Sequence, residues 1–133
     1  MQVERTVFFI SDGTGITAGA LGQLLAHFPQ TNFKQVRAPF TDSVAKIEEA
    51  KQRMLTAKAT DGMRPVVIMS LGNIEHRALI KEADAYFIDL FNTFIDPLAI
   101  ELAQEPLTGK GIAHGVMGAN YHERMEAINF TLT

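Results

Sequence analysis

Short runs of β-branched and aromatic residues alternate with longer amphipathic stretches through most of the chain. Such runs predict strands, and the strands of a parallel sheet are commonly apolar on both faces. The second run mixes apolar and polar residues and includes Pro39, which cannot donate to a sheet ladder, so we expect an edge strand there. The predicted strands cover residues 6–10, 32–40, 65–71 and 85–91.

The stretches that follow these runs carry apolar residues at three- and four-residue steps, which is the spacing of amphipathic helices. The first predicted helix ends before Pro29. Its expected core-facing residues are Ile16, Ala20, Leu21, Leu24, Leu25 and Phe28. The second is capped by Asp42 or Ser43 and ends at Asp61-Gly62. Its expected core-facing residues are Val44, Ile47, Ala50, Met54 and Leu55.

Two further helices complete this pattern. A short one is expected to start near Ile74, after the turn at Gly72-Asn73. Asp96-Pro97 is a suitable N-cap and first-turn pair for a helix through about Ala103. The resulting β-α-β-α-β-α-β-α order predicts an α/β fold over residues 1–106. We expect a doubly wound, mainly parallel sheet of about four strands flanked by helices.

The pattern changes after this predicted domain. Four glycines between Leu107 and Gly118 predict a linker. Asn120 and Glu123 form a capping box, which predicts a C-terminal helix. The apolar stripe of that helix comprises Tyr121, Met125, Ile128 and Leu132. Residues 107–133 are therefore expected to form a Gly-rich linker and a helix.

Composition narrows the class of protein. The 133-residue chain has a formal net charge of −3 and no basic cluster, which argues against a nucleic-acid partner. It has no cysteine, which excludes disulfides and thiolate metal sites and fits a reducing cytoplasm. Neither a membrane-length apolar run nor a secretory start is present, and the four histidines lack metal-ligand spacing. We expect a cytoplasmic protein with no membrane partner and no metal site.

The turn after the first predicted strand carries the clearest chemical signal. It places two glycines among small polar side chains at the start of a helix. There, free backbone N–H groups and the helix dipole favour an anion, so we expect phosphate or nucleotide binding. The glycines would also suit a turn that is merely tight. The candidate binding residues are Ser11, Asp12, Gly13, Thr14, Gly15 and Thr17.

Two narrower interpretations of this turn fit less well. Residues 13–18 satisfy a relaxed G-x-G-x-x-G/A dinucleotide pattern, but the acidic residue for a ribose is at best Asp42, beyond a proline. Asp12 as the phosphoryl acceptor of a haloacid-dehalogenase-type phosphatase lacks the first aspartate of that motif, since Ile10 stands there. Capping by Ser11 or Asp12, and orientation of a water or metal, stay open.

Asp89 lies within the fourth predicted strand, where a carboxylate needs a partner or a cleft. If this strand end protrudes at the carboxyl edge of the sheet, Asp89 lies near the ligand crevice of such folds, and a structural role fits equally well. No Walker P-loop is present, since Gly109-Lys110-Gly111 lacks the earlier glycine and the following Ser/Thr. The catalytic residues are therefore not identified.

Residues 6–21, with S-D-G-T-G-I-T-A from Ser11 to Ala18, closely resemble the opening of the bacterial phosphoenolpyruvate synthase regulatory proteins. These are similar to the plant pyruvate, phosphate dikinase regulatory proteins. Gly19 departs from the pattern, because the family usually has glutamate there, which puts a contact of that carboxylate in doubt. Further resembling positions are Pro39-Phe40, Asp89-Leu90-Phe91, Phe94-Ile95, Pro97-Leu98, Tyr121, Arg124–Ile128 and Phe130.

This resemblance implies a bifunctional enzyme. Such proteins transfer phosphate from ADP to a threonine of a target synthase and remove it by phosphorolysis with inorganic phosphate, releasing pyrophosphate. ADP and inorganic phosphate would be the substrates, and phosphoenolpyruvate synthase or pyruvate, phosphate dikinase the protein partner. The resemblance puts a P-loop, with Mg²⁺ as an expected cofactor, in a C-terminal half beyond Thr133. A homodimer is expected, and Asp89 and Arg124 are candidate cleft residues.

Three roles stay open for this chain. In the first it is an N-terminal domain that supplies phosphate, nucleotide or target binding and is inactive alone. In the second it is a non-catalytic docking and dimerisation module, with all phosphate chemistry in the other half. In the third it is a self-contained nucleotide-binding α/β enzyme such as a dehydrogenase, which the poor placement of Asp42 disfavours.

Overall fold

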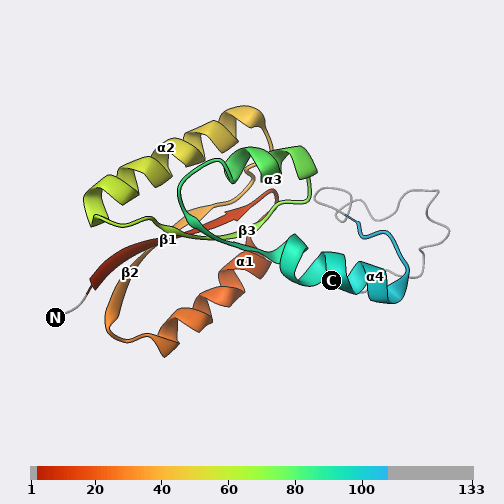
Figure 1. Cartoon of the computed structure of the whole chain (residues 1–133), viewed down its shortest axis with the longest axis horizontal. Helices are drawn as coiled ribbons and strands as arrows, with labels where there is room; N and C mark the ends of the chain where they lie inside the picture. The colour runs from red at the N-terminus through yellow and green to blue at the C-terminus, as the bar shows by residue number, and fades with distance from the viewer. Residues whose placement is uncertain (1–2, 108–133) are drawn as a thin grey trace.

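The sheet predicted from the sequence is present in the computed structural model, which describes residues 3–107 (Figure 1). Within these residues four strands pair side by side, and every pairing is parallel. Their spatial order is β2-β1-β3-β4, so the second strand lies at an edge, as its mixed composition and Pro39 predict. The strands are β1 (Val3–Ser11), β2 (Thr31–Ala38), β3 (Val66–Ser70) and β4 (Tyr86–Asp89).

Helices cover both faces of the sheet, which confirms the doubly wound α/β prediction. α1 (Ile16–Ala20) continues as the 3₁₀ helix η1 (Leu21–His27) and lies on one face. Figure 1 shows α2 (Val44–Asp61) and α3 (Ile74–Ile80) on the opposite face. After β4, the π-helical turn η2 (Phe91–Ile95) leads directly into α4 (Asp96–Leu102).

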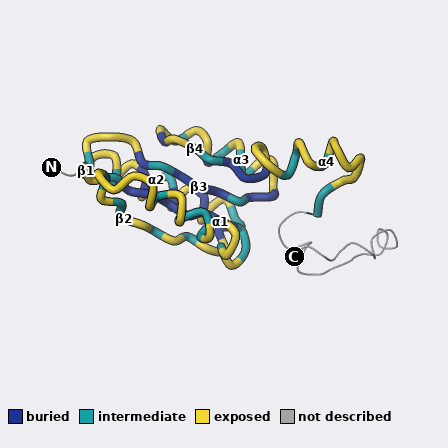
Figure 2. The backbone as a smooth tube through the Cα atoms, turned by 90° about the horizontal axis from the view of Figure 1, so that it is seen from below, coloured by how far each residue is buried: buried dark blue, intermediate teal, exposed yellow. Residues whose placement is uncertain are grey.

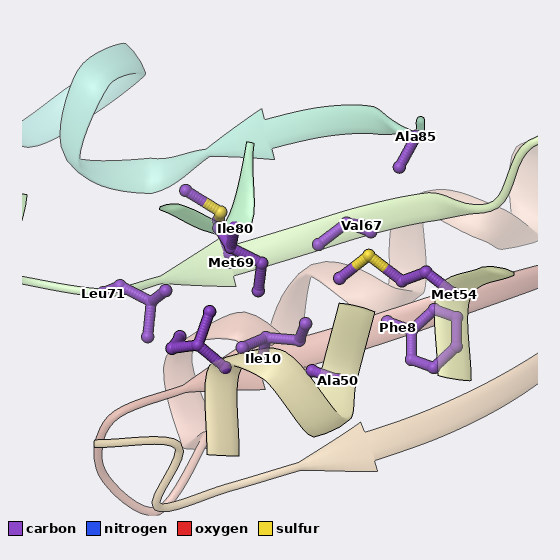
Figure 3. Close-up of a cluster of buried hydrophobic side chains, with 10 residues drawn as sticks. Phe8, Ile10, Ala50, Met54, Val67, Met69, Leu71, Ile80 and Ala85 are labelled. Carbon is purple, nitrogen blue, oxygen red and sulfur yellow. The ribbon is translucent and has the colours of Figure 1, made fainter. Parts of the chain in front are cut away.

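The central strand β1 separates two hydrophobic cores. Its residues alternate between the two faces of the sheet, as the twofold side-chain period of a strand requires. In Figure 2 the buried residues of β1 and β3 are dark blue. Val7 and Phe9 pack with Ala18 of α1 and Ile68 of β3. On the other face the larger core, drawn in Figure 3, comprises Phe8, Ile10, Ile47, Ala50, Met54, Val67, Met69, Leu71, Ile80 and Ala85.

The first helix differs from the prediction. It changes from α to 3₁₀ after Ala20, and four of its six expected core residues are exposed: Ile16 (72%), Ala20, Leu24 (47%) and Phe28 (60%). The reason is that small residues make its close approach to the sheet. Ala18 is fully buried, and a Cβ on Gly22 would lie 3.3 Å from the ring of Phe9. The larger side chains of Leu21 and Leu25 pack against this core but are only partly buried.

The ends of α2 are as predicted. The Ser43 hydroxyl oxygen accepts a hydrogen bond from the Lys46 N–H at 3.2 Å, and Gly62 ends the helix with φ +77°. Two expected core residues, Val44 and Leu55, are instead exposed. At about 100° per residue, both lie roughly 90° or more around the helix from the centre of the buried stripe. The stripe itself comprises only Ile47, Ala50 and Met54.

The start of the last described helix also differs from the prediction. Asp96 does not cap α4, because Ile95 before it is already helical, and the carboxylate of Asp96 lies 3.5 Å from the Arg77 guanidinium. The helical segment begins earlier. There the Asp89 Oδ1 accepts hydrogen bonds from the N–H groups of Phe91 and Asn92. Asp89 therefore caps this helical segment, one segment earlier than the sequence predicts.

Most of the predicted linker and all of the predicted C-terminal helix lie outside the described residues, as does Arg124. Within residues 3–107, no helix combines the length and apolar character that a membrane span requires.

Candidate functional site

The strand order creates one position at which a ligand crevice is expected. β1 is followed by α1 on one face of the sheet, whereas β3, its neighbour, is followed by α3 on the other face. Connections that leave neighbouring strands toward opposite faces open a crevice at the carboxyl ends of those strands. This position between β1 and β3 is the topological switch point of the sheet. The glycine turn after β1 and the turn after β3 meet there.

The turn after β1 is organised around Ser11. Its side chain is buried, and its hydroxyl oxygen accepts a hydrogen bond from the Gly13 N–H at 3.0 Å. Gly15 follows with φ +85°, a conformation that side chains disfavour, and it starts α1. The two glycines thus have separate roles. Gly15 adopts the left-handed conformation before α1, and the N–H of Gly13 donates to the Ser11 hydroxyl.

Asp12 connects the turn after β1 to the end of β3 and the turn after it. Its carboxylate accepts a hydrogen bond from the Gly72 N–H at 3.0 Å, and its own N–H donates to the Ser70 carbonyl at 3.3 Å. A carboxylate on a backbone N–H makes a charge-assisted hydrogen bond. The prediction that Asp12 contacts a phosphate stays a prediction, since this contact gives the side chain a structural role.

A third segment, the turn between β2 and α2, packs against the same loop. The Phe40 N–H donates to the Gly13 carbonyl and the Thr41 N–H to the Ser11 carbonyl, both at 2.8 Å. The Thr41 hydroxyl donates to the Ala38 carbonyl, also at 2.8 Å. Phe40 has φ +55°, which is uncommon for a non-glycine residue, and its side chain is half exposed. The loop is thus held from both neighbouring strands.

The start of α1 leaves hydrogen-bond donors facing solvent. Among the described residues, the backbone N–H groups of Ile16 and Thr17 have no acceptor, as expected for the first turn of a helix. The side chains of Thr14 and Thr17 are exposed, and no partner of their hydroxyls is found between residues 3 and 107. These amides and hydroxyls can together coordinate an anion.

Arg37 supplies positive charge near this loop, which the sequence alone did not indicate. A Cβ on Gly19 would lie 3.3 Å from the Arg37 guanidinium, so this side chain covers Gly19 from β2. Gly19 is one helical turn, about 6 Å, beyond Gly15. In the part of the chain that the structure describes, Arg37 has no ion-pair partner. The resembling family usually has glutamate at the position of Gly19, and a side chain there would lie against this guanidinium.

Asp89 is separate from the glycine loop. It ends β4, which is two strands away from β1, and it is buried (4% exposed). Lys81 Nζ lies 2.8 Å from its Oδ2, and its Oδ1 caps η2. These contacts give the carboxylate a structural role, and its place in a ligand cleft stays a prediction.

The structure therefore brings together residues 11–17 with two segments that sequence reasoning did not assign, Thr41 and Gly72. The sequence gives one indication that these two residues belong to the site. Each comes directly after a predicted strand, and parallel strands end at the same edge of a sheet. Within residues 3–107, no group of three acidic or histidine side chains is suited to hold a metal ion.

Comparison with known proteins gives a consistent result. A family model described as kinase/pyrophosphorylase matches residues 7–133. A protein of Methylobacillus flagellatus is 52% identical over 129 residues, which cover 97% of this chain and 48% of the relative. A protein of Aromatoleum aromaticum is 47% identical over 130 residues, covering 96% of this chain and 47% of that relative. Both are provisionally named phosphoenolpyruvate synthase regulatory protein.

A protein of the same provisional name from Pseudomonas aeruginosa is 40% identical over 134 residues, covering 99% of this chain and 49% of the relative. The chain thus spans about half the length of the curated relatives it matches.

Proposed function

The chain belongs to the kinase/pyrophosphorylase family, and from this membership we propose that it is the N-terminal part of a regulator of phosphoenolpyruvate synthase. The whole regulator transfers the β-phosphoryl group of ADP to a threonine hydroxyl of the synthase, leaving AMP. In the opposite direction inorganic phosphate takes the phosphoryl group from phosphothreonine and leaves as pyrophosphate. The regulator acts as a homodimer in the cytoplasm.

Within this function, residues 11–17 bind a phosphate group of a substrate. Phosphoryl transfer depends on stabilising charge on phosphate oxygens more than on covalent chemistry by the protein. The observation that carries this assignment is the pair of N–H groups at Ile16 and Thr17, at the switch point of the sheet, which have no acceptor within residues 3–107. The hydroxyls of Thr14 and Thr17 add donors, and Arg37 is the nearby cation.

Phe40 gives the same site a surface for a nucleoside. Its backbone N–H donates to the Gly13 carbonyl, so Phe40 lies beside the glycine loop, and its side chain is half exposed. Aromatic rings stack on nucleobases without needing hydrogen bonds. In this proposal the ring of Phe40 stacks on the adenine of ADP while the loop binds a phosphate.

The chain leaves other catalytic parts to the rest of the protein. Phosphoryl transfer enzymes place a lysine and a metal-binding hydroxyl at the phosphates, commonly from a P-loop, and the sequence has no such motif. Mg²⁺, where the reaction uses it, is therefore expected in the C-terminal half. Asp12 holds the loop in shape through Gly72 rather than acting as a base.

Amide NMR shifts during titration test the binding site. Phosphate, ADP and AMP are added separately to the 133-residue chain, and amides 11–18 are followed against Gly62, a glycine remote from the switch point. We expect saturable shifts at millimolar ligand or below. Phe40→Leu should weaken ADP and AMP binding severalfold and leave phosphate binding unchanged, whereas Thr17→Val should weaken all three.

Other outcomes of these experiments would favour the two alternative roles, a docking and dimerisation module or a self-contained enzyme. If amides 11–18 do not move at millimolar ligand while the chain still captures the synthase, the docking and dimerisation role replaces the phosphate-binding role. Calorimetric binding of a dinucleotide would favour a self-contained enzyme. Phosphorylation of the synthase from ADP by the 133-residue chain alone would contradict the division between the two halves.

A further inference from the structure

The segment formed by η2 and α4 is a helical arm with few contacts to the domain. No residue of α4 is buried, and Figure 2 shows the arm extending beyond the sheet, with most of its residues exposed. Four large apolar side chains of the arm are more than half exposed. Ile100 (81%) is one, and Phe94 (57%), Leu98 (55%) and Leu102 (52%) are the other three. Apolar side chains gathered in this way on a surface indicate a contact site.

These three side chains belong to one groove. Together with Ile95 and Ala99 they line a concave apolar surface that reaches Pro106, where the described chain ends one residue later. The five positions follow the helical repeat of about 3.6 residues, so they form a stripe along a single face. A stripe of this form is suited to pack against a second amphipathic helix.

We propose that residues 120–132 of the same chain dock in this groove. Their apolar positions recur at four-, three- and four-residue steps, which predicts the complementary stripe. The segment follows the groove closely in sequence, since only residues 107–119 separate it from Pro106. The residues proposed to contact the groove are Tyr121, Met125, Ile128 and Leu132.

The length of the connection favours this occupant over a second copy of the chain. Residues 108–119 can span about 40 Å when extended, whereas α4 is only about 10 Å long, so the connection permits docking. Connections of this length commonly give an effective concentration of about 1 mM. A second copy at micromolar concentration is therefore outcompeted by roughly a hundredfold or more.

The absence of cysteine from the sequence allows a disulfide test in the 133-residue chain. The test protein carries Leu98→Cys with Ile128→Cys. The matched control carries Ile100→Cys with Ile128→Cys, because Ile100 lies on the same helix, is 81% exposed and does not line the groove. After mild oxidation we expect the intrachain disulfide to form at least tenfold faster in the test protein. Equal rates, no intrachain disulfide or covalent dimers alone would each overturn the proposal.

Amide hydrogen exchange gives an independent readout. Leu98→Glu places a charge in the groove and should speed exchange of residues 120–132 severalfold, while exchange in β1 and β3 stays unchanged. Ile100→Glu should leave all these rates as they are. Unchanged exchange in the Leu98 variant, or equal acceleration by both, would show that the groove does not hold this segment. Neither experiment depends on whether residues 11–17 bind phosphate.

Discussion

The carboxylate of Asp12 and the backbone N–H of Gly72, 60 residues apart in sequence, are joined by a 3.0 Å hydrogen bond. This contact connects the turn after β1 to the turn after β3, the two segments that border the switch point. A side chain that the sequence presents as a candidate ligand for substrate is therefore part of the frame that shapes the loop.

Removing this contact should lower stability. Hydrogen bonds to charged groups contribute about 1.5–3 kcal/mol, and this one is partly exposed, so we expect Asp12→Ala to lower the free energy of unfolding by about 1–2 kcal/mol. Asp12→Asn keeps an oxygen acceptor and should lose about half as much. Urea unfolding measures both. An Asp12→Ala protein as stable as the parent would mean that the hydrogen bond contributes nothing.

Gly15 should be the intolerant glycine of the loop. Its φ of +85° costs a residue with a side chain about 1 kcal/mol, so Gly15→Ala should lower stability by that amount and weaken phosphate binding. Gly13→Ala is the control within the loop, since its Cβ would make an ordinary 3.9 Å contact with Ser11. Gly62→Ala is the control for strain alone, because φ is +77° and no atom lies within 4 Å. Equal phosphate affinity in the Gly15 and Gly62 variants would contradict a binding role for the loop.

Gly19 should accept the glutamate that the resemblance leads one to expect. Gly19→Gln should raise stability by about 0.5–1 kcal/mol, because glycine is a poor helix former and the neighbouring guanidinium of Arg37 is a flexible group that can shift. Gly19→Glu should add a further few tenths of a kcal/mol through an exposed ion pair with Arg37. Comparing the two variants in low and high salt isolates that pair. A Glu–Gln difference that does not shrink in high salt would exclude it.

Asp61 should make stability depend on acid pH. Its side chain is 1% exposed, and burial opposes ionisation, but hydrogen bonds from Lys34 and Thr6 outweigh burial and hold its pKa below the ordinary 3.8. A lowered folded-state pKa contributes stability above pH 3.8 that is lost as pH falls through the folded value. Unfolding measured from pH 6 to pH 2.5 should show this loss, and Asp61→Asn should reduce it. An identical pH profile in the variant would assign the loss to other carboxylates.

The architecture was predictable because its determinants are local. β-Branched runs and helical spacing gave the strand and helix order, and parallel strands with short crossovers leave few alternatives. Ser43 and Gly62 were recognisable as the ends of α2, since caps depend on the residue at one position. The prediction that Asp96 is a cap is wrong for two reasons. Asp89 already caps the preceding helical turn through local hydrogen bonds, and tertiary packing puts Arg77 of α3 beside Asp96.

The sequence by itself determined that this is a parallel α/β domain with an anion-suited glycine turn after its first strand, since period, composition and glycine placement are properties of short segments. Only the tertiary structure decided the strand order, the switch point between β1 and β3, and the partners of each polar side chain. Asp12 meets Gly72, Arg37 covers Gly19, and Thr41 and Phe40 support the loop, because folding brings distant segments within hydrogen-bond reach. No pattern along the chain encodes those distances directly.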